Sequence, residues 1–265
     1  MKTKELKKGY TTGVFTSLAF KSALEAFLTT KSTAISKTTK NDNDDLDVTK
    51  GCEIVVTITN QLKELELNSV PQEPHIFTNS SNKISIYAGS GVGIVTKKGL
   101  KIKPNFAAIN PKPLEAIEEL FKNMTDYYTN LSMYCSVSVT DGVEIAKKTA
   151  NAKVGVIGGI SILGTKGIVK PVSSSAYIDS VETEIKFAHS NAYSALVFTL
   201  GNSALKVARQ KYNEEQIIEV GNFVYDSIKI AQEVKVKKVI FLCGIGKMTK
   251  VAQGFTNTHN RFWYN

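Results

Sequence analysis

The sequence predicts two halves of different architecture: an N-terminal α+β half over residues 1–152, and a Rossmann-like α/β half with a mostly parallel sheet over residues 153–265. In the first half, strand and helix patterns follow one another without regular alternation, which is typical of α+β proteins. In the second half, the order strand, glycine turn, helix recurs three times, as in parallel sheets with binding loops after their strands. With 265 residues, of which 42% are hydrophobic, the chain can form two cores of modest size.

The first half begins with a helix expected over residues 11–28, because Val14, Leu18 and Ala19 start an apolar pattern at helical spacing. Strands are then expected over 48–59, 83–88, 94–100 and 135–140, and helices over 110–121 and 143–149. The polar segment 29–47 is part strand at most. Its acidic end is expected to be a loop.

The second half is more regular. Strands are expected over 153–157, 193–200 and 238–242. Helices are expected over 173–189 and 220–234, after the turn Gly201-Asn-Ser203 as far as Lys211, and from near Met248. Each strand runs into a glycine-rich segment, and the carboxyl ends of parallel strands share one edge of a sheet. We therefore expect binding loops at that edge.

The net charge of +9 is spread along the chain without a dense basic run, so it favours a small polyanionic ligand over nucleic acid. The sequence has no run of eighteen apolar residues and no apolar signal segment after its basic start. We expect a cytoplasmic protein without a membrane partner; a homo-oligomer stays open. Three scattered cysteines and three distant histidines predict neither a disulfide framework nor a bound metal.

Glycine-rich loops are the main candidate binding elements. Residues 158–171 hold four glycines, two lysines and no acid. Glycine permits positive φ and close ligand approach to the backbone, and a following helix offers free N–H groups; the alternative is that the glycines only form tight turns. Segments 89–93 and 244–249 leave an ATP-dependent small-molecule kinase as a further alternative, although the phosphate-loop spacing is absent.

Two charged segments complete the candidates. The acidic cluster Asp42, Asp44, Asp45 and Asp47 is either a solvated loop or a source of a general base. The closing stretch clusters Lys247, Lys250, Asn257, Thr258, His259 and Arg261. Such a run is either the polar face of a surface helix or a carboxylate-binding surface, in which arginine forms the bidentate contact.

Taken in order along nearly the whole chain, these segments resemble the cobalt-precorrin-5B carbon-1 methyltransferase family of anaerobic cobalamin biosynthesis. The resemblance runs through Gly9-Tyr-Thr-Thr-Gly13, Asp44-Asp-Leu-Asp-Val-Thr49, Gly91-Val-Gly-Ile-Val-Thr-Lys97, Ala108-Ile-Asn-Pro111, Glu144-Ile-Ala-Lys-Lys-Thr149, Gly158-Gly-Ile-Ser-Ile-Leu-Gly-Thr165, Gly167-Ile-Val-Lys-Pro171, Gly201-Asn202, Asn222-Phe-Val224, Ile245-Gly-Lys247 and Asn257-Thr-His259.

The resemblance implies S-adenosylmethionine-dependent methylation of carbon 1 of a cobalt-containing tetrapyrrole, cobalt-precorrin-5B, to give cobalt-precorrin-6A. The sulfonium donor carries an activated methyl group, so alignment is the main catalytic requirement and no protein-bound metal is expected. On this basis Asp44, Asp45, Asp47 and His259 are candidate bases. Expected donor contacts are Gly158, Gly159, Ser161, Gly164, Thr165, Gly201 and Asn202. Expected contacts of the ring substrate are Thr11, Thr12, Lys97, Lys170, Lys247 and Arg261.

The sequence departs from the family pattern at a few places. Val14-Phe15 replace the usual Thr-Cys, Asn41 and Leu46 alter the acidic loop, and Gly244 stands where the family has histidine. The family also continues well past its Asn-Thr-His, so the expected C-terminal extension is missing after Asn265. A shortened relative that binds a corrinoid without methylating it is therefore the alternative.

Overall fold

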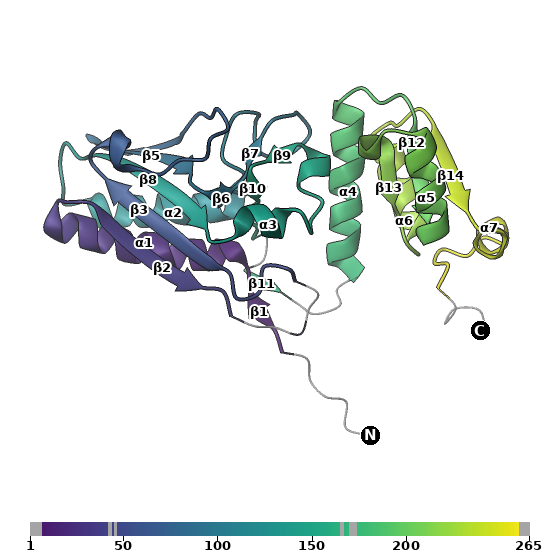
Figure 1. Ribbon diagram of the computed structural model, residues 1–265, viewed down its shortest axis with the longest axis horizontal. Coiled ribbons are helices and arrows are strands. Elements are labelled where there is room, and N and C mark those ends of the chain that lie inside the picture. Colours follow the sequence, from purple (N-terminus) through teal and green to yellow (C-terminus); the bar gives the residue numbers. More distant parts are fainter. Residues whose placement is uncertain (1–6, 42–43, 45–46, 165–166, 170–173, 260–265) are drawn as a thin grey trace, which may run out of the picture. The chain divides into compact units, whose positions relative to one another are not determined.

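The computed structural model describes residues 7–41, 44, 47–164, 167–169 and 174–259 (Figure 1). The chain forms two compact units. Unit 1 comprises residues 1–97 and 101–172, and unit 2 comprises residues 98–100 and 173–265. Segment 153–172, which the sequence analysis assigned to the second half, thus belongs to unit 1. Each unit is described by itself below.

Unit 1 is built on a five-stranded mixed sheet in the order β2-β3-β8-β5-β4. Its strands are β2 (Ala34–Thr39), β3 (Glu53–Thr59), β8 (Ser132–Val139), β5 (Asn82–Ala88) and β4 (His75–Asn79). Only the β5–β8 pair is parallel. The helices α1 (Thr12–Thr30) and α2 (Pro111–Thr125) pack beside each other against this sheet (Figure 1).

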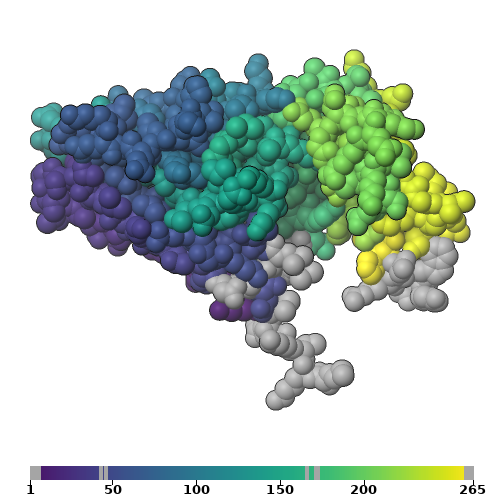
Figure 2. Space-filling view, in the orientation of Figure 1, coloured from purple at the N-terminus to yellow at the C-terminus, as the bar shows by residue number. Residues whose placement is uncertain are grey.

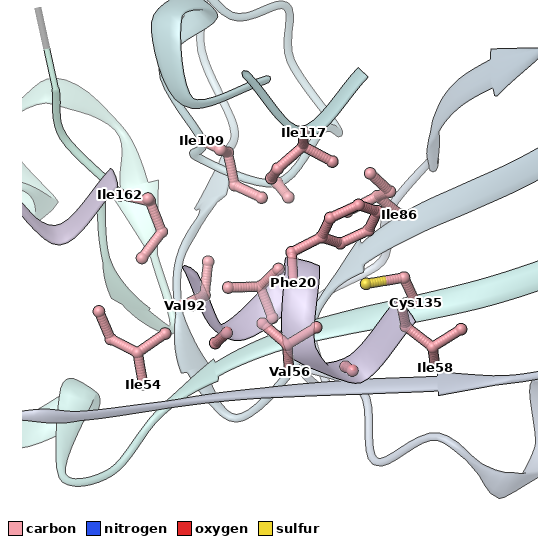
Figure 3. Close-up of a cluster of buried hydrophobic side chains, with 14 of the residues drawn as sticks. Phe20, Ile54, Val56, Ile58, Ile86, Val92, Ile109, Ile117, Cys135 and Ile162 are labelled. Carbon is pink, nitrogen blue, oxygen red and sulfur yellow. The ribbon is translucent and has the colours of Figure 1, made fainter. Parts of the chain in front are cut away.

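Alternation along the strands explains the core of unit 1. In β3, Ile54, Val56 and Ile58 point to one face and are fully buried. They lie in one cluster with Phe20 of α1 and Ile117 of α2 (Figure 3). Period-two burial on a strand facing two helices is the expected pattern of a sheet covered on one side.

Short strand pairs complete unit 1. The pair β6 (Gly91–Val92) and β10 (Gly159–Ile160) is parallel, whereas β7 (Ile94–Val95) with β9 (Val156–Ile157) and β1 (Gly9–Tyr10) with β11 (Ile168–Val169) are antiparallel. The remaining elements are α3 (Gly142–Ala146) and the 3-10 turns η1 (Leu62–Glu64) and η2 (Ala152–Val154).

Unit 2 holds a parallel three-stranded sheet in the order β13-β12-β14, formed by β13 (Ile217–Glu219), β12 (Leu196–Leu200) and β14 (Val239–Cys243). Its helices are α4 (Ser174–Ser190), α5 (Asn202–Lys211), α6 (Val224–Glu233) and α7 (Ile245–Ala252), with the 3-10 turn η3 (Glu214–Gln216). Every residue of β12 is buried. Leu196, Phe198 and Leu200 pack with α4 and α6, and Val197 packs with α5, so helices cover both faces.

The long helices and most strands expected from the sequence are confirmed, including α1, α2, α4 and β12. Three expectations are wrong. The strand expected over residues 94–100 is limited to β7, because residues 97–100 form bends. Residues 153–157 do not form one strand, because residues 152–154 form η2 and Gly155 leaves it with φ of 72°. The third parallel strand is instead β13, which was not predicted because it has only three residues and directly follows the acidic 3-10 turn η3.

Candidate functional site

In unit 1, an N-terminal arm of residues 7–13 connects three of the segments that carry the family resemblance. On one side, β1 pairs with β11, the Thr11 N–H donates to the Gly167 carbonyl at 3.0 Å, and the Gly13 N–H donates to the Leu163 carbonyl at 2.8 Å. These bonds attach the start of α1 to the glycine-rich segment at Leu163 and at residues 167–169. Two segments far apart in the sequence therefore form one backbone structure.

The acidic loop lies on the other side of the arm. The Lys7 N–H donates to Asp44 Oδ2 at 2.7 Å, and the Asp44 N–H donates back to the Lys7 carbonyl at 3.0 Å. The Tyr10 N–H donates to Asn41 Oδ1 at 3.3 Å. Asp44, a predicted base, is exposed. The arm thus brings Asp44 and the glycine-rich loop to neighbouring positions.

Thr12 and the hydroxyl oxygen of Thr11, both predicted to contact the ring substrate, are buried. Thr12 is buried, and its Oγ1 donates to the Leu163 carbonyl at 3.2 Å and accepts from the Leu163 N–H at 2.8 Å. The Thr11 hydroxyl oxygen is buried and has no hydrogen-bond partner within the described part of the chain. The hydroxyl group of Thr12 therefore has a structural role, because both of its hydrogen bonds join α1 to Leu163.

Asp47, another predicted base, forms a structural ion pair. Its carboxylate accepts from the ammonium of Lys40, whose side chain is 1% exposed, and from the backbone N–H of Thr49 at 2.9 Å. Burial acts to raise the pKa of Asp47, but the hydrogen bonds from Lys40 and Thr49 outweigh it and lower the pKa. A carboxylate stabilised in this way is a poor proton acceptor near neutral pH.

Three large apolar side chains on the arm and its partner loop are exposed. Tyr10 is 51% exposed, Leu163 53% and Ile168 48%. Tyr10 and Ile168 are direct cross-strand partners, and Leu163 is bonded to residues 12 and 13. We call these three residues the arm platform. Exposed apolar side chains gathered on one short paired segment favour contact with a ligand or partner.

The glycines Gly158 and Gly159, predicted to contact the donor, have close neighbours. A Cβ on Gly159 would overlap the carbonyl of Gly91, and a Cβ on Gly142 would overlap the same carbonyl. A Cβ on Gly158 would approach the Asn68 amide, which donates to the Gly158 carbonyl at 2.9 Å. Glycine at these positions allows three backbone segments to pack against each other.

A shallow cavity of about 180 Å³ lies beside these glycines. It is lined by Val143, Ala146, Lys147, Ala152, Val156, Ile157, Gly158 and Gly159. Ser161 donates its hydroxyl to Asn151 Oδ1 at 3.3 Å, and Gly164 lies against Thr11 and Pro113. Lys97, predicted to contact the ring substrate, is exposed and is the last residue of the first stretch of unit 1, residues 1–97.

In unit 2, the carboxyl edge of the parallel sheet carries an open glycine at two strand ends. Gly201 follows β12 and Gly244 follows β14, and a Cβ at either position would meet nothing within 4 Å. Each is the N-cap of a helix, α5 or α7, and has no side chain to cap it. The first N–H groups of both helices thus lack an intrahelical acceptor, and Asn202 begins α5 at an exposed position.

Asn222 is the centre of a hydrogen-bond network at the same edge. Its Oδ1 accepts from Lys247 Nζ at 3.2 Å and from Thr258 Oγ1 at 3.1 Å, and its carbonyl accepts from the Thr258 N–H at 3.1 Å. The buried Lys250 donates to the Thr258 carbonyl at 3.3 Å. The exposed His259 follows, with its N–H donating to Asn257 Oδ1 at 2.9 Å.

The structure therefore brings Gly201, Asn202, Lys247 and His259 to one unit, and Thr11, Thr12, Asp44, Asp47 and the 158–164 residues to the other. Asp45, Thr165, Lys170 and Arg261 lie outside the described residues. The sequence analysis missed the arm platform and Asn222. A signal for Asn222 was present, because Gly221-Asn222 follows β13 as Gly201-Asn202 follows β12.

Within the described residues, no group of three or more His, Cys, Asp or Glu side chains is placed to hold a metal ion. No described helix combines the length and apolar character needed to cross a membrane. Burial raises the pKa of the Cys243 thiol, with the charge of Lys247 acting in the opposite direction.

The class of protein follows from comparison with known families. Residues 28–171 match the model of the CbiD family. A Methanococcus maripaludis protein named cobalt-precorrin-5B C(1)-methyltransferase is 42% identical over 233 residues, which cover 87% of this chain and 60% of that protein. A Geobacillus thermodenitrificans protein of the same name is 35% identical, covering 98% of this chain and 74% of that protein. The chain belongs to the CbiD family.

One solved structure is also similar. The cobalamin biosynthesis protein cbiD from Archaeoglobus fulgidus is 28% identical and matches over 95% of this chain and 81% of that chain, with a TM-score of 0.42. The chain spans about three-fifths of the length of the Methanococcus maripaludis relatives.

Proposed function

We propose that the chain transfers the methyl group of S-adenosylmethionine to carbon 1 of cobalt-precorrin-5B, giving cobalt-precorrin-6A in anaerobic cobalamin biosynthesis. Membership of the CbiD family and the names of its relatives support this activity. The observation that carries it is the convergence of four family segments, at residues 201–202, 222–224, 245–247 and 257–259, on one edge of the sheet in unit 2.

The donor is proposed to bind at that edge, in a Rossmann-like arrangement. Gly201 and Gly244 leave room for a ligand to approach the backbone at the ends of adjacent parallel strands. The unpaired N–H groups of α5 and α7 favour the oxygen atoms of a ribose or carboxylate. Because S-adenosylmethionine brings its own leaving group, the chain need only align sulfur, methyl and carbon.

The ring substrate is proposed to contact the arm platform of unit 1. A tetrapyrrole has broad apolar faces and carboxylate side arms, so it complements exposed Tyr10, Leu163 and Ile168. Residues 145–178 contain five lysines and no acid, which favours an anionic ligand on this part of the chain. Cobalt belongs to the substrate and needs no ligand from the protein.

Asp44 is the proposed base of unit 1, should the methylated ring lose a proton. It is exposed and bonded to the arm through backbone groups, whereas Asp47 is committed to Lys40. The donor roles predicted for Gly158 and Gly159 stay predictions, and their close packing favours a structural role. His259 stays a second candidate base.

The test is methyl transfer from isotopically labelled S-adenosylmethionine to cobalt-precorrin-5B under anaerobic conditions. We expect label in the ring and S-adenosylhomocysteine as the second product. Calorimetry with S-adenosylhomocysteine should give binding that Gly244→Trp abolishes by filling the open edge, while Tyr127→Ala, at a 94% exposed position of unit 1, leaves it unchanged. Ring binding without label transfer would instead establish a non-catalytic corrinoid-binding protein.

A further inference from the structure

We infer that Lys247, held in position by Asn222, binds a carboxylate group of the ligand at the sheet edge of unit 2. Asn222 is then a positioning residue, which acts through Lys247. This inference rests on the proposed function and adds to it the chemistry by which the edge recognises its ligand. Either the methionine part of the donor or a side arm of the ring supplies such a carboxylate.

The position of Lys247 is unusual for a lysine. Its side chain is half-buried in the first turn of α7, and its ammonium donates to the neutral Asn222 Oδ1 at 3.2 Å. Lys247 has no carboxylate partner among the described residues. Partial removal of a charge from water without a counter-ion is costly, so a carboxylate from a ligand would stabilise Lys247 at this position.

The sequence on either side of Lys247 contains no acidic residue that could serve as its counter-ion. Residues 234–265 contain five lysines, one arginine and no Asp or Glu. Lys250, three residues after Lys247, is also buried, and its ammonium donates to the carbonyl of Thr258. These residues therefore supply no side-chain carboxylate to Lys247, which favours binding of an anion there.

An asparagine suits this purpose better than an aspartate. Its amide oxygen accepts from both Lys247 and Thr258, so both hold the amide in one orientation. The amide orients the ammonium without neutralising it. An aspartate at position 222 would offer the same two acceptor interactions but would also form an ion pair with Lys247 and occupy its charge.

This difference provides a test that separates a ligand-binding role from a structural one. If Lys247 binds a carboxylate, Asn222→Asp should weaken ligand binding by about tenfold, similar to Lys247→Met, although it preserves both acceptor interactions. If the network only stabilises the fold, Asn222→Asp should bind the ligand as the wild type does, and Asn222→Ala should show the largest loss of binding and stability. The two roles predict opposite rank orders.

A control variant accompanies these substitutions. Lys211→Met removes one positive charge from the last residue of α5, at the other end of the helix from Gly201, and should leave binding unchanged. A tenfold loss of affinity with Lys211→Met would overturn the inference by showing that the overall charge of unit 2, and not the position of Lys247, decides binding.

The probes identify the source of the carboxylate. S-adenosylhomocysteine and 5′-methylthioadenosine differ in the amino-acid part, and cobyrinic acid and its neutral methyl ester differ in the carboxylates of the corrin ring. Calorimetry should show that Lys247→Met and Asn222→Asp weaken the binding of one acid-bearing probe and leave the affinity for its counterpart without the acid unchanged. The affected pair names the source. Loss of affinity should be greatest at low salt, because high ionic strength screens the attraction between the ammonium group and the carboxylate.

The possible failures can be told apart. If the wild type binds the acid-bearing probes and transfers methyl groups, but Lys247→Met binds both as tightly as the wild type, the inference is wrong and the proposed function stands. If the wild type binds neither acid-bearing probe, the proposed function fails as well. Thermal unfolding of each variant distinguishes a lost contact from a lost fold.

Discussion

The two units use the same residue types in opposite ways. In unit 1, the carbonyl of Gly91 lies where a Cβ on Gly142 or Gly159 would have to be, so these glycines are closed in by other backbone. In unit 2, Gly201 and Gly244 have nothing within 4 Å of an added Cβ. Glycine-rich sequence therefore marks tight packing in one unit and open strand ends in the other.

Two lysines show the same contrast. Lys40 of unit 1 is fully buried and paired with the carboxylate of Asp47, whereas Lys247 of unit 2 is half-buried and held by the neutral amide of Asn222. The first cation is satisfied within the protein and stabilises the fold. The second keeps its charge available. Satisfied groups support structure, and groups left available are where ligand binding should be sought.

The largest effect on stability should come from breaking the buried Lys40–Asp47 ion pair of unit 1. Asp47→Asn leaves Lys40 buried without a counter-ion and should lower the free energy of unfolding by about 3–5 kcal/mol. Chemical denaturation measures this loss. Glu53→Gln, which breaks the exposed Lys37–Glu53 pair, is the matched control and should change stability little. Equal losses in the two variants would contradict the distinction.

The same pair predicts a pH dependence. Because the pKa of Asp47 is lower in the folded chain than the ordinary value of an aspartate, the pair contributes its full stabilisation above that ordinary value. The contribution is lost as the pH falls through the folded pKa. Stability measured from neutral to acidic pH should thus fall more steeply for the wild type than for Asp47→Asn, which lacks this carboxylate.

An intermediate effect is expected from closing a packed glycine. Gly159→Ala places a methyl group against the carbonyl of Gly91, which is backbone and cannot swing away. Stability should fall by about 3 kcal/mol, comparable with other overpacked positions. Thermal unfolding provides the measurement, and a melting temperature equal to that of the wild type would show that the three segments separate easily.

The smallest effect on stability should come from the open edge. Gly244→Ala adds a methyl group where nothing lies within 4 Å and where φ is −71°, so stability should stay within about 0.5 kcal/mol of the wild type. Binding of S-adenosylhomocysteine should nevertheless weaken. If binding is unchanged while Gly244→Trp abolishes it, the donor approaches this edge without touching Gly244.

The sequence predicted the elements that carry long periodic patterns. Helix α1 and helix α2, with its prolines in the first turn, are examples, since the local spacing of apolar residues predicts them, although neither N-cap side chain forms a capping hydrogen bond. Strand β13 was missed, because three residues cannot carry a pattern. The sequence also could not distinguish closed from open glycines, since contacts such as Gly91 with Gly159 join residues distant in the chain.

The candidate site shows the same limit. The segments were recognised one by one, and the positions of Lys247 and His259 in unit 2 followed from the strand ends. Asn222 as the common partner of Lys247 and Thr258 did not, because the bonds span 25 and 36 residues. Asp47 was predicted as a base from its acidic neighbours, and only the buried Lys40 reveals its other use.

The pairing of β1 with β11 also determines when unit 1 can be completed during synthesis. Gly9 and Tyr10 are translated long before their partners Val169 and Ile168, which come almost at the end of the unit. Most of unit 1 must therefore be translated before the arm can attach. Until then Tyr10 lacks its cross-strand partner Ile168, so the attachment of the arm is a late step in the folding of unit 1.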